Sequence, residues 1–171
     1  CWRDRFPVVK VNWYDASNFC QGAEKKLPSE KQWEKSARGE TSNQYPWGKK
    51  FNSGYANLSS KSGNKNSLAE VGSYPKSATP FGVSDLVGNV WEWTEDDYNP
   101  YKGSTYQNKN FGKRFKVLRG QSAKNIGHFP GTTYLLALKM FARSGCLLYT
   151  PDAADEGLGV NLRSSRTIKK F

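Results

Sequence analysis

The sequence predicts an α+β domain in which two short helices and several short strands are joined by long ordered loops. Apolar residues follow helical spacing near the start of the chain, and short segments further along alternate apolar with polar residues. The 16 Gly and 8 Pro indicate many loops. The chain of 171 residues has the length of one domain. Only 36% of the residues are hydrophobic, but 14% are aromatic, and large rings bury enough area for a core.

A short strand and a helix are the first elements expected. Residues 7–13 alternate apolar side chains, which predicts a strand. Apolar residues then recur at helical spacing from Trp13 to Ala23. Asn12 or Asp15 is suited to cap the start of this helix.

The second helix is predicted to begin at Ser29, because Ser29 and Gln32 have the spacing of a capping box. Gly39 is suited to end this helix as a C-cap. From residue 41 to residue 80 no periodicity persists, and we expect ordered loops there. Loops of this length are usually functional or held by a further element such as a metal. Rings suited to pin these loops are Tyr45, Trp47, Phe51, Tyr55 and Tyr74.

Two tryptophans mark the next strand. Trp91 and Trp93 alternate with Glu92, a pattern typical of a strand that buries one face. The preceding Gly88-Asn89 is a turn signal, since both residues tolerate a positive φ. Asp85 and Glu92 are hard oxygen donors close to this turn, which is compatible with a calcium site or with a core strand that carries incidental carboxylates.

The second half of the chain contains three further apolar segments. Residues 115–119 predict a strand. Residues 134–141 are apolar without alternation, which fits a buried strand or helix, and we favour a strand. Residues 146–149 form another apolar cluster, and residues 160–163 alternate as a final strand.

The net charge of +11 is spread thinly along the chain. Residues 121–160 hold as many acidic as basic side chains, and only the tail after residue 161 concentrates positive charge. A nucleic-acid-binding protein normally gathers basic residues along one element, so we expect no nucleic-acid partner. No apolar run has the length of a membrane span.

Cysteine and histidine are scarce. Cys1, Cys20 and Cys146 contain no Cys-x-x-Cys pair and, with the single His128, form no zinc pattern. One disulfide is possible but cannot be assigned. His128 has no evident acidic or nucleophilic partner, so we interpret it as a loop or contact residue rather than a catalyst.

Several motifs occur in a fixed order between residues 7 and 120. They include the blocks 7–16, 26–39, 45–48, 55–58, 71–75, 81–83, 88–94 and 117–120. This order resembles the formylglycine-generating-enzyme domain, also called the sulfatase-modifying-factor domain. The resemblance implies a single C-type-lectin-like domain over residues 1–171, with two helices, a small antiparallel sheet and much ordered irregular chain.

A calcium site is also implied by the resemblance. The family's ligands correspond to the side chain of Asp85, the carbonyl groups of Gly88 and Val90, and the carboxylate of Glu92. All four positions are filled compatibly, so we expect a structural calcium ion. A second family site would begin at Asn57, but the residues that follow it lack an acidic ligand.

Two departures from the family bear on function. Family domains begin several tens of residues earlier, so we expect a fragment or a companion chain that supplies the N-terminal part. Catalytic members carry Gly-Gly-Ser and then a closely spaced cysteine pair that binds copper(I). Here Gly120-Gln121-Ser122 is followed only by Cys146, and a lone thiol cannot form a two-thiolate site. The iron site of the related sulfoxide-forming members is rich in His, and this chain has one His. We therefore expect no enzyme activity.

The remaining frame is similar to the variable proteins of diversity-generating retroelements, which display hypervariable positions on a C-terminal segment. Residues 119–122 resemble the start of that segment and residues 159–165 resemble its end. The chain between them mixes rings with apolar and small polar groups, which suits protein recognition.

We expect a ligand-binding surface within residues 121–159, with some of these residues in the core. Candidate contacts are Ala123, Lys124, Ile126, His128, Phe129, Thr132, Tyr134, Cys146, Leu147, Leu148, Tyr149, Asp152 and Asp155. A protein or cell-surface ligand is expected, and the resemblance implies an extracellular or cell-surface location. Two alternatives remain open: a divergent oxidase of the formylglycine-generating type, and a pseudo-enzyme that partners a sulfatase.

Overall fold

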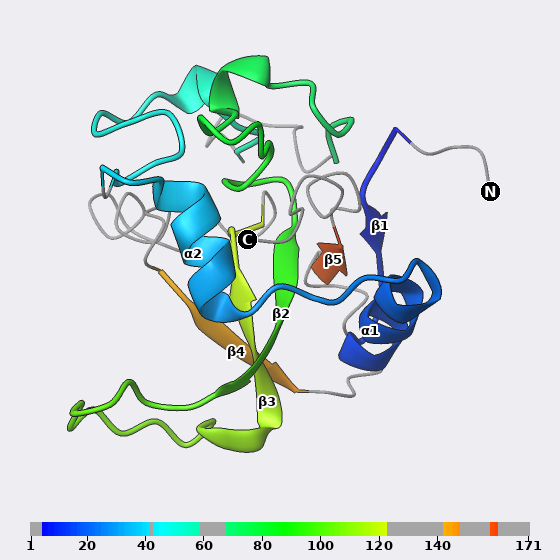
Figure 1. Cartoon of the computed structure of the whole chain (residues 1–171), viewed down its shortest axis with the longest axis vertical. Coiled ribbons are helices and arrows are strands. Elements are labelled where there is room, and N and C mark those ends of the chain that lie inside the picture. Colours follow the sequence, from blue (N-terminus) through cyan, green and yellow to red (C-terminus); the bar gives the residue numbers. More distant parts are fainter. Residues whose placement is uncertain (1–4, 42, 59–67, 123–141, 148–157, 161–171) are drawn as a thin grey trace.

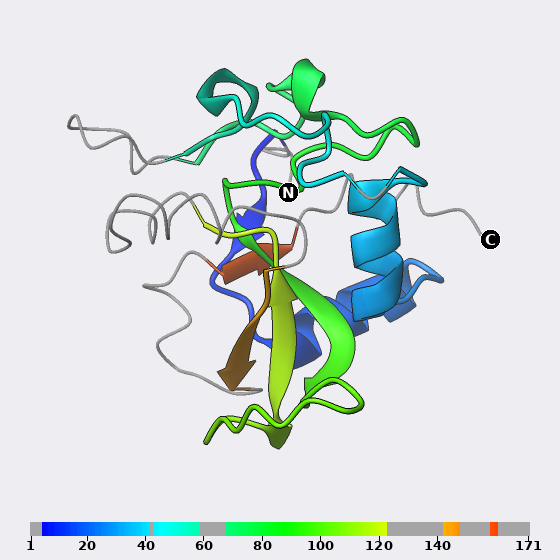
Figure 2. The same cartoon turned by 90° about the vertical axis from the view of Figure 1, so that its left-hand side faces the viewer.

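The computed structural model describes residues 5–41, 43–58, 68–122, 142–147 and 158–160. Five strands form one sheet in the order β1-β5-β2-β3-β4. In chain order the elements are β1 (Val8–Val9), α1 (Trp13–Gly22), α2 (Glu30–Arg38), the 3₁₀ helices η1 (Ser53–Tyr55) and η2 (Pro75–Ser77), β2 (Trp91–Tyr98), β3 (Gly112–Arg119), β4 (Ser144–Leu147) and β5 (Leu158–Val160). Figure 1 shows α1 close to β1, and Figure 2 shows α2 beside β2 and β3. None of the described helices is both long enough and apolar enough to cross a membrane.

Both helices begin where the sequence predicts. Asn12 Oδ1 accepts a hydrogen bond from the Asp15 amide at 2.9 Å, and Asp15 Oδ2 accepts one from the Asn12 amide at 3.1 Å. Ser29 and Gln32 form the same reciprocal pair at α2, and Gly39 caps its C-terminus with a φ of 63°. Strand β1 is shorter than predicted, because Lys10, directly after it, has a φ of 63° and breaks the extended conformation before the capping box of α1 begins at Asn12.

The sheet is mixed. The pairs β2–β3, β3–β4 and β1–β5 are antiparallel, whereas β5 runs parallel to β2. The expectation of an antiparallel sheet is therefore confirmed for β2-β3-β4, and β5 adds a parallel pairing that the sequence did not indicate. The predicted final strand at 160–163 overlaps β5 at Val160; residues 161–163 and the predicted strand at 134–141 lie outside the described residues.

Strand β2 is buried on both faces at its start, which differs from the one buried face predicted. Trp91 and Trp93 belong to a core cluster with residues of α1, β3 and β4. Glu92 points to the opposite side, where Trp33 of α2 belongs to a second cluster with the irregular chain. Two cores thus meet at β2, and a polar side chain between them becomes buried.

Aromatic contacts hold the long irregular segment after α2, as predicted. The rings of Tyr45 and Trp47 stack with centroids 5.5 Å apart. Phe51 packs 5.6 Å from Tyr45, and Tyr55 packs edge-on 5.6 Å from Trp47. Rings bury much area per residue, which explains how this segment is ordered although its described regular elements are the short helices η1 and η2.

Candidate functional site

Glu92 on β2 lies at the buried end of the predicted calcium site. The residue is 6% exposed. Its Oε2 accepts a hydrogen bond from the indole nitrogen of Trp33 at 2.5 Å. Its Oε1 has no hydrogen-bond partner among the described residues. Leaving a buried carboxylate oxygen without a donor is costly, so a proton or a cation at this atom would be stabilising.

Burial raises the pKa of Glu92 to about 8. The negative charge of Asp85 adds to this rise, and the hydrogen bond from Trp33 opposes it. Asp85 is also buried, and its Oδ2 accepts a hydrogen bond from the Gly72 amide at 2.7 Å. Two neighbouring buried carboxylates repel each other, and one divalent cation would neutralise both.

Close backbone packing fixes the turn before β2, which carries the carbonyl groups predicted to bind calcium. Gly88 has a φ of 76°, and a Cβ at this position would lie 2.3 Å from the carbonyl oxygen of Asn57, so only glycine fits. The Gly88 carbonyl accepts a hydrogen bond from the Val90 amide at 2.8 Å, which leaves it a second lone pair. A Cβ placed on Gly120 would lie 3.5 Å from the Leu86 oxygen and 3.6 Å from the Val90 oxygen, so these two carbonyls border one space.

The four residues predicted to bind calcium fit a hard cation by their donor chemistry. They offer oxygen ligands only, which calcium prefers, and one carboxylate oxygen is unsatisfied. No cluster of three or more His, Cys, Asp or Glu side chains occurs in the described part of the chain. A cation at Asp85 and Glu92 would therefore need the backbone carbonyls as further ligands.

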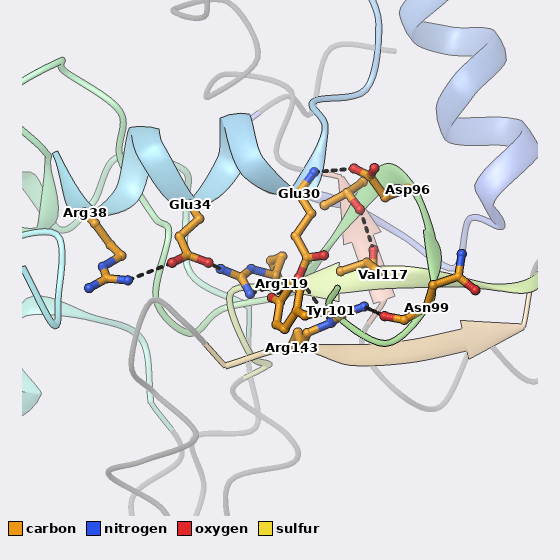
Figure 3. Close-up of polar contacts among 10 residues, drawn as sticks. Glu30, Glu34, Arg38, Asp96, Asn99, Tyr101, Val117, Arg119 and Arg143 are labelled. Carbon is orange, nitrogen blue, oxygen red and sulfur yellow. Dashed lines mark hydrogen bonds and ion pairs between the residues drawn. The ribbon is translucent and has the colours of Figure 1, made fainter. Parts of the chain in front are cut away.

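A chain of alternating charges joins α2 to the end of β3 and the start of β4 (Figure 3). We call it the α2 charge network, and its members in order are Arg38, Glu34, Arg119, Glu30 and Arg143. Glu34 accepts hydrogen bonds from Arg38 at 2.8 Å and from Arg119 at 2.7 Å. Glu30 Oε1 lies 3.3 Å from Arg119 Nη1 and 3.2 Å from Arg143 Nε. The Arg119 side chain is fully buried, so these pairs act where the dielectric constant is low.

Arg143 is held by rings and backbone as well. Its guanidinium lies 4.4 Å from the ring centroid of Tyr101 and 4.8 Å from that of Tyr98. Its Nη2 donates to the carbonyl of Asn99 at 2.9 Å. The hydroxyl of Tyr101 donates to Glu30 at 2.9 Å, and burial, together with this hydrogen bond, raises the pKa of Tyr101. Glu30 thus links the residue at the end of β3 with the residue that precedes β4.

Most of the predicted ligand contacts lie outside the described residues: Ala123, Lys124, Ile126, His128, Phe129, Thr132, Tyr134, Leu148, Tyr149, Asp152 and Asp155. Cys146 is described and is 8% exposed, in the core cluster with Trp91 and Leu118. Its side chain therefore packs inward. Leu147 is half-buried, and Gln121 and Ser122 at the start of the segment are buried.

Sequence reasoning missed the α2 charge network. Glu30 and Arg119 are 89 residues apart, and no local pattern pairs them. One signal was available: Glu30, Glu34 and Arg38 follow at i, i+4 spacing, which places them on one side of a helix.

Known proteins resemble this chain in sequence and in fold. Residues 2–154 match the sulfatase-modifying factor enzyme 1-like domain. The chain is 37% identical to the inactive C-alpha-formylglycine-generating enzyme 2 of Mus musculus, over 93% of this chain and 49% of that protein. It is 34% identical to the hercynine oxygenase of Mycobacterium tuberculosis, over 68% of this chain and 29% of that protein. The chain therefore spans about half the length of the first relative and less of the second.

A solved structure shares the fold. The Treponema denticola variable protein 1 matches with a TM-score of 0.66 and 21% identity, over 91% of this chain and 70% of that chain. At this identity the likeness shows a common architecture, and the two helices and the β2-β3-β4 sheet described above belong to it.

Proposed function

The chain belongs to the family of sulfatase-modifying factor enzyme 1-like domains, and from this premise we propose that it is a non-catalytic member that binds a ligand. The observation that carries this proposal is the burial of Cys146. Copper(I) chemistry in the family needs a pair of thiolates, and Cys146 is the single cysteine after Arg119. Its side chain lies in the core, where a thiolate is disfavoured.

Two further observations support a non-catalytic role. Cys20 is also buried, and burial raises the pKa of its thiol, so it is a poor source of a second thiolate. The mouse relative that aligns with 93% of this chain is named as an inactive enzyme.

The proposed binding surface is the segment 121–159, as the sequence composition suggests. The frame around this segment supports the proposal, because Glu30 contacts Arg119 just before it and Arg143 within it. A rigid frame allows residues in a connecting segment to change without loss of the fold. The proposed ligand is a protein or cell-surface group, met outside the cell.

We also propose a structural calcium ion at Asp85 and Glu92, with the carbonyls of Gly88 and Val90. When bound, the ion would neutralise two buried carboxylates. The chain's own part is to hold the donors in place: Trp33 orients Glu92, and the Gly72 amide orients Asp85.

Sequencing of the gene across natural isolates tests the binding surface. We expect substitutions at scattered sites between Gly120 and Gly159, with residues 71–94 of the same gene as a constant control. A segment 121–159 that changes as slowly as residues 71–94 would overturn the proposal of a diversified surface. It would favour a dedicated pseudo-enzyme, such as a partner of a sulfatase, and co-purification with that partner would support this reading.

A divergent oxidase is the second candidate, because the family also contains the hercynine oxygenase relative. A copper(I)-loaded sample of the protein, incubated with oxygen and a cysteine-containing peptide, tests it. We expect no formylglycine by mass spectrometry. Product that appears with the wild type and disappears with Cys146→Ser would replace the binding proposal.

A further inference from the structure

Helix α2 and the end of β2, with the chain that follows it, enclose an open cleft of about 920 Å³, which we call the α2 cleft. One wall is the part of α2 and its C-cap from Glu30 to Glu40, and the other runs from Asp96 to Lys102. Arg143 completes the lining. With the exception of Arg143, the lining residues lie outside the segment 121–159, so this surface is distinct from the proposed ligand-binding surface.

The inner acidic side chains of the α2 cleft already have partners within the protein. Glu30 and Glu34 are neutralised in the α2 charge network. Asp97 forms an ion pair with Lys116 at 2.8 Å, and Asp96 accepts a hydrogen bond from the Glu30 amide at 2.5 Å. These carboxylates therefore offer little to a bound cation.

In contrast to these paired carboxylates, three lysines that line the α2 cleft are exposed. Lys31 and Lys35 are exposed on α2 at i, i+4 spacing, which places them on one side of the helix. Lys102 is exposed on the opposite wall. Among the described residues, none of these three ammonium groups has an ion-pair partner. Glu40, just after α2, is also exposed, so the cleft presents separate positive charges from both walls and one negative charge beyond the C-terminal end of α2.

The state of the two arginines that line the α2 cleft indicates which kind of anion the cleft would bind. Arg38 and Arg143 already contact carboxylates, so their guanidinium forks are engaged. Such forks bind a single carboxylate or phosphate through two hydrogen bonds, whereas a lysine ammonium binds either anion as a point charge. Three separate lysines therefore suit anionic groups that are themselves spaced apart, as the carboxylates of an acidic peptide are. Tyr101, on the second wall, is 54% exposed. The hydrogen bond from its hydroxyl to Glu30 and the contact with Arg143 fix the position of the ring. The ring therefore offers a preformed surface on which an apolar group of a ligand can pack.

We propose that the α2 cleft binds an acidic peptide segment of a partner protein. Carboxylates of the peptide pair with Lys31, Lys35 and Lys102, and an apolar side chain between them packs on the ring of Tyr101. Since the lysines are exposed, the affinity is modest and falls with ionic strength.

The test is an NMR titration of the isotope-labelled protein with a capped peptide of glutamates around a central leucine. The matched probe replaces every glutamate by glutamine. We expect amide shifts in residues 31–40 and 96–102 with the acidic peptide alone, and weaker binding in high salt. Shifts with both peptides, or with neither, would overturn the proposal. Shifts in these residues with inorganic phosphate but not with the acidic peptide would also overturn it, in favour of a small-anion site.

A matched pair of variants separates the cleft from general charge attraction. Lys31→Glu with Lys35→Glu should raise the Kd about tenfold or more, since two attractions become repulsions. Lys49→Glu with Lys50→Glu makes the same change of net charge on exposed residues outside the cleft, and should leave the Kd within about twofold. Equal weakening by both pairs would overturn the proposal. Lys31→Gln with Lys35→Gln, checked by thermal unfolding, serves if charge reversal disturbs α2. None of these results depends on the segment 121–159.

Discussion

Glu30 and Glu92 are both buried carboxylates, at 8% and 6% exposure, but the groups that surround them differ in charge. Glu30 meets two guanidinium groups and a phenol hydroxyl. Glu92 meets an indole N–H and the negative charge of Asp85. Trp33 joins the two systems, because its nitrogen donates to Glu92 while its ring stacks under Arg119 at 4.9 Å. Among the residues that the structure describes, Glu30 is neutralised by side chains of the protein, whereas Glu92 has no cationic partner, so a proton or a cation from solution would stabilise it.

Arg119→Ala, which removes a partner of Glu30, is expected to lower the stability of the protein more than any of the changes that follow. Removing one partner of a buried ion pair leaves charges uncompensated, so we expect a loss of about 3–5 kcal/mol in the free energy of unfolding. Urea denaturation measures it, and Lys102→Ala on the surface should change stability by less than about 0.5 kcal/mol. A loss below about 1 kcal/mol would mean that Glu30 and Glu34 do not need Arg119.

Calcium should stabilise the protein through Glu92 and not through Glu30. At a free concentration near 100 times its Kd, calcium should raise the free energy of unfolding by about 2.7 kcal/mol. Glu92→Gln keeps an oxygen that can accept from Trp33 but removes the charge, so this gain should be lost. Thermal unfolding with calcium or with a chelator checks it. An equal gain in Glu30→Gln and in the wild type is the expected control result, and an equal gain in Glu92→Gln would place the ion elsewhere.

Without calcium, stability should depend on pH through Glu92. Its pKa is raised from 4.5 to about 8, so between these values the folded protein keeps a proton that the unfolded chain has lost. The contribution is therefore full below the unfolded pKa and declines as the pH rises through this window. We expect a fall of about 2 kcal/mol between about pH 6 and 7.5, measured by urea denaturation with a chelator present. The same slope in Glu92→Gln would assign it to another group.

The smallest expected effect is a loss of stability at the N-terminus of α2, where Glu30 is the first helical residue. Ser29→Ala removes the hydroxyl that accepts from the Gln32 amide and should cost about 1 kcal/mol. Circular dichroism during thermal unfolding measures this loss. Ser29→Asp restores an acceptor and should recover most of it. No difference between the Ala and Asp variants would show that α2 is positioned by its packing alone.

These two carboxylates also show how far the sequence alone could lead. The start of α2 and the turn before β2 were predicted because Ser29 with Gln32, and Gly88 with Asn89, are local signals. The burial of Glu92 was not, since Trp33, the residue that donates to it, is 59 residues away. A period of two in a strand indicates two different faces, and it does not show that a second core covers the polar one.

The candidate binding surface was predictable only as a composition. Cys146 was included because it lies in an apolar cluster, and the structure places its side chain in the core. Apolar residues are common both in cores and in recognition surfaces, so sequence cannot separate them. Arg143 follows a segment without periodicity, and its contact with Glu30 depends on β4 pairing with β3.

The place of β5 in the sheet also sets the order in which the protein can be completed during synthesis. Val160 pairs with Val8, and the neighbouring Leu158 pairs with Trp91 on the other side. The ribosome must therefore synthesise the chain through residue 160 before β1 and β2 gain the strand between them. Contacts so distant in sequence slow folding and leave strand edges exposed meanwhile. A nascent chain that stalls before residue 158 would carry these open edges, which are targets for chaperones and for aggregation.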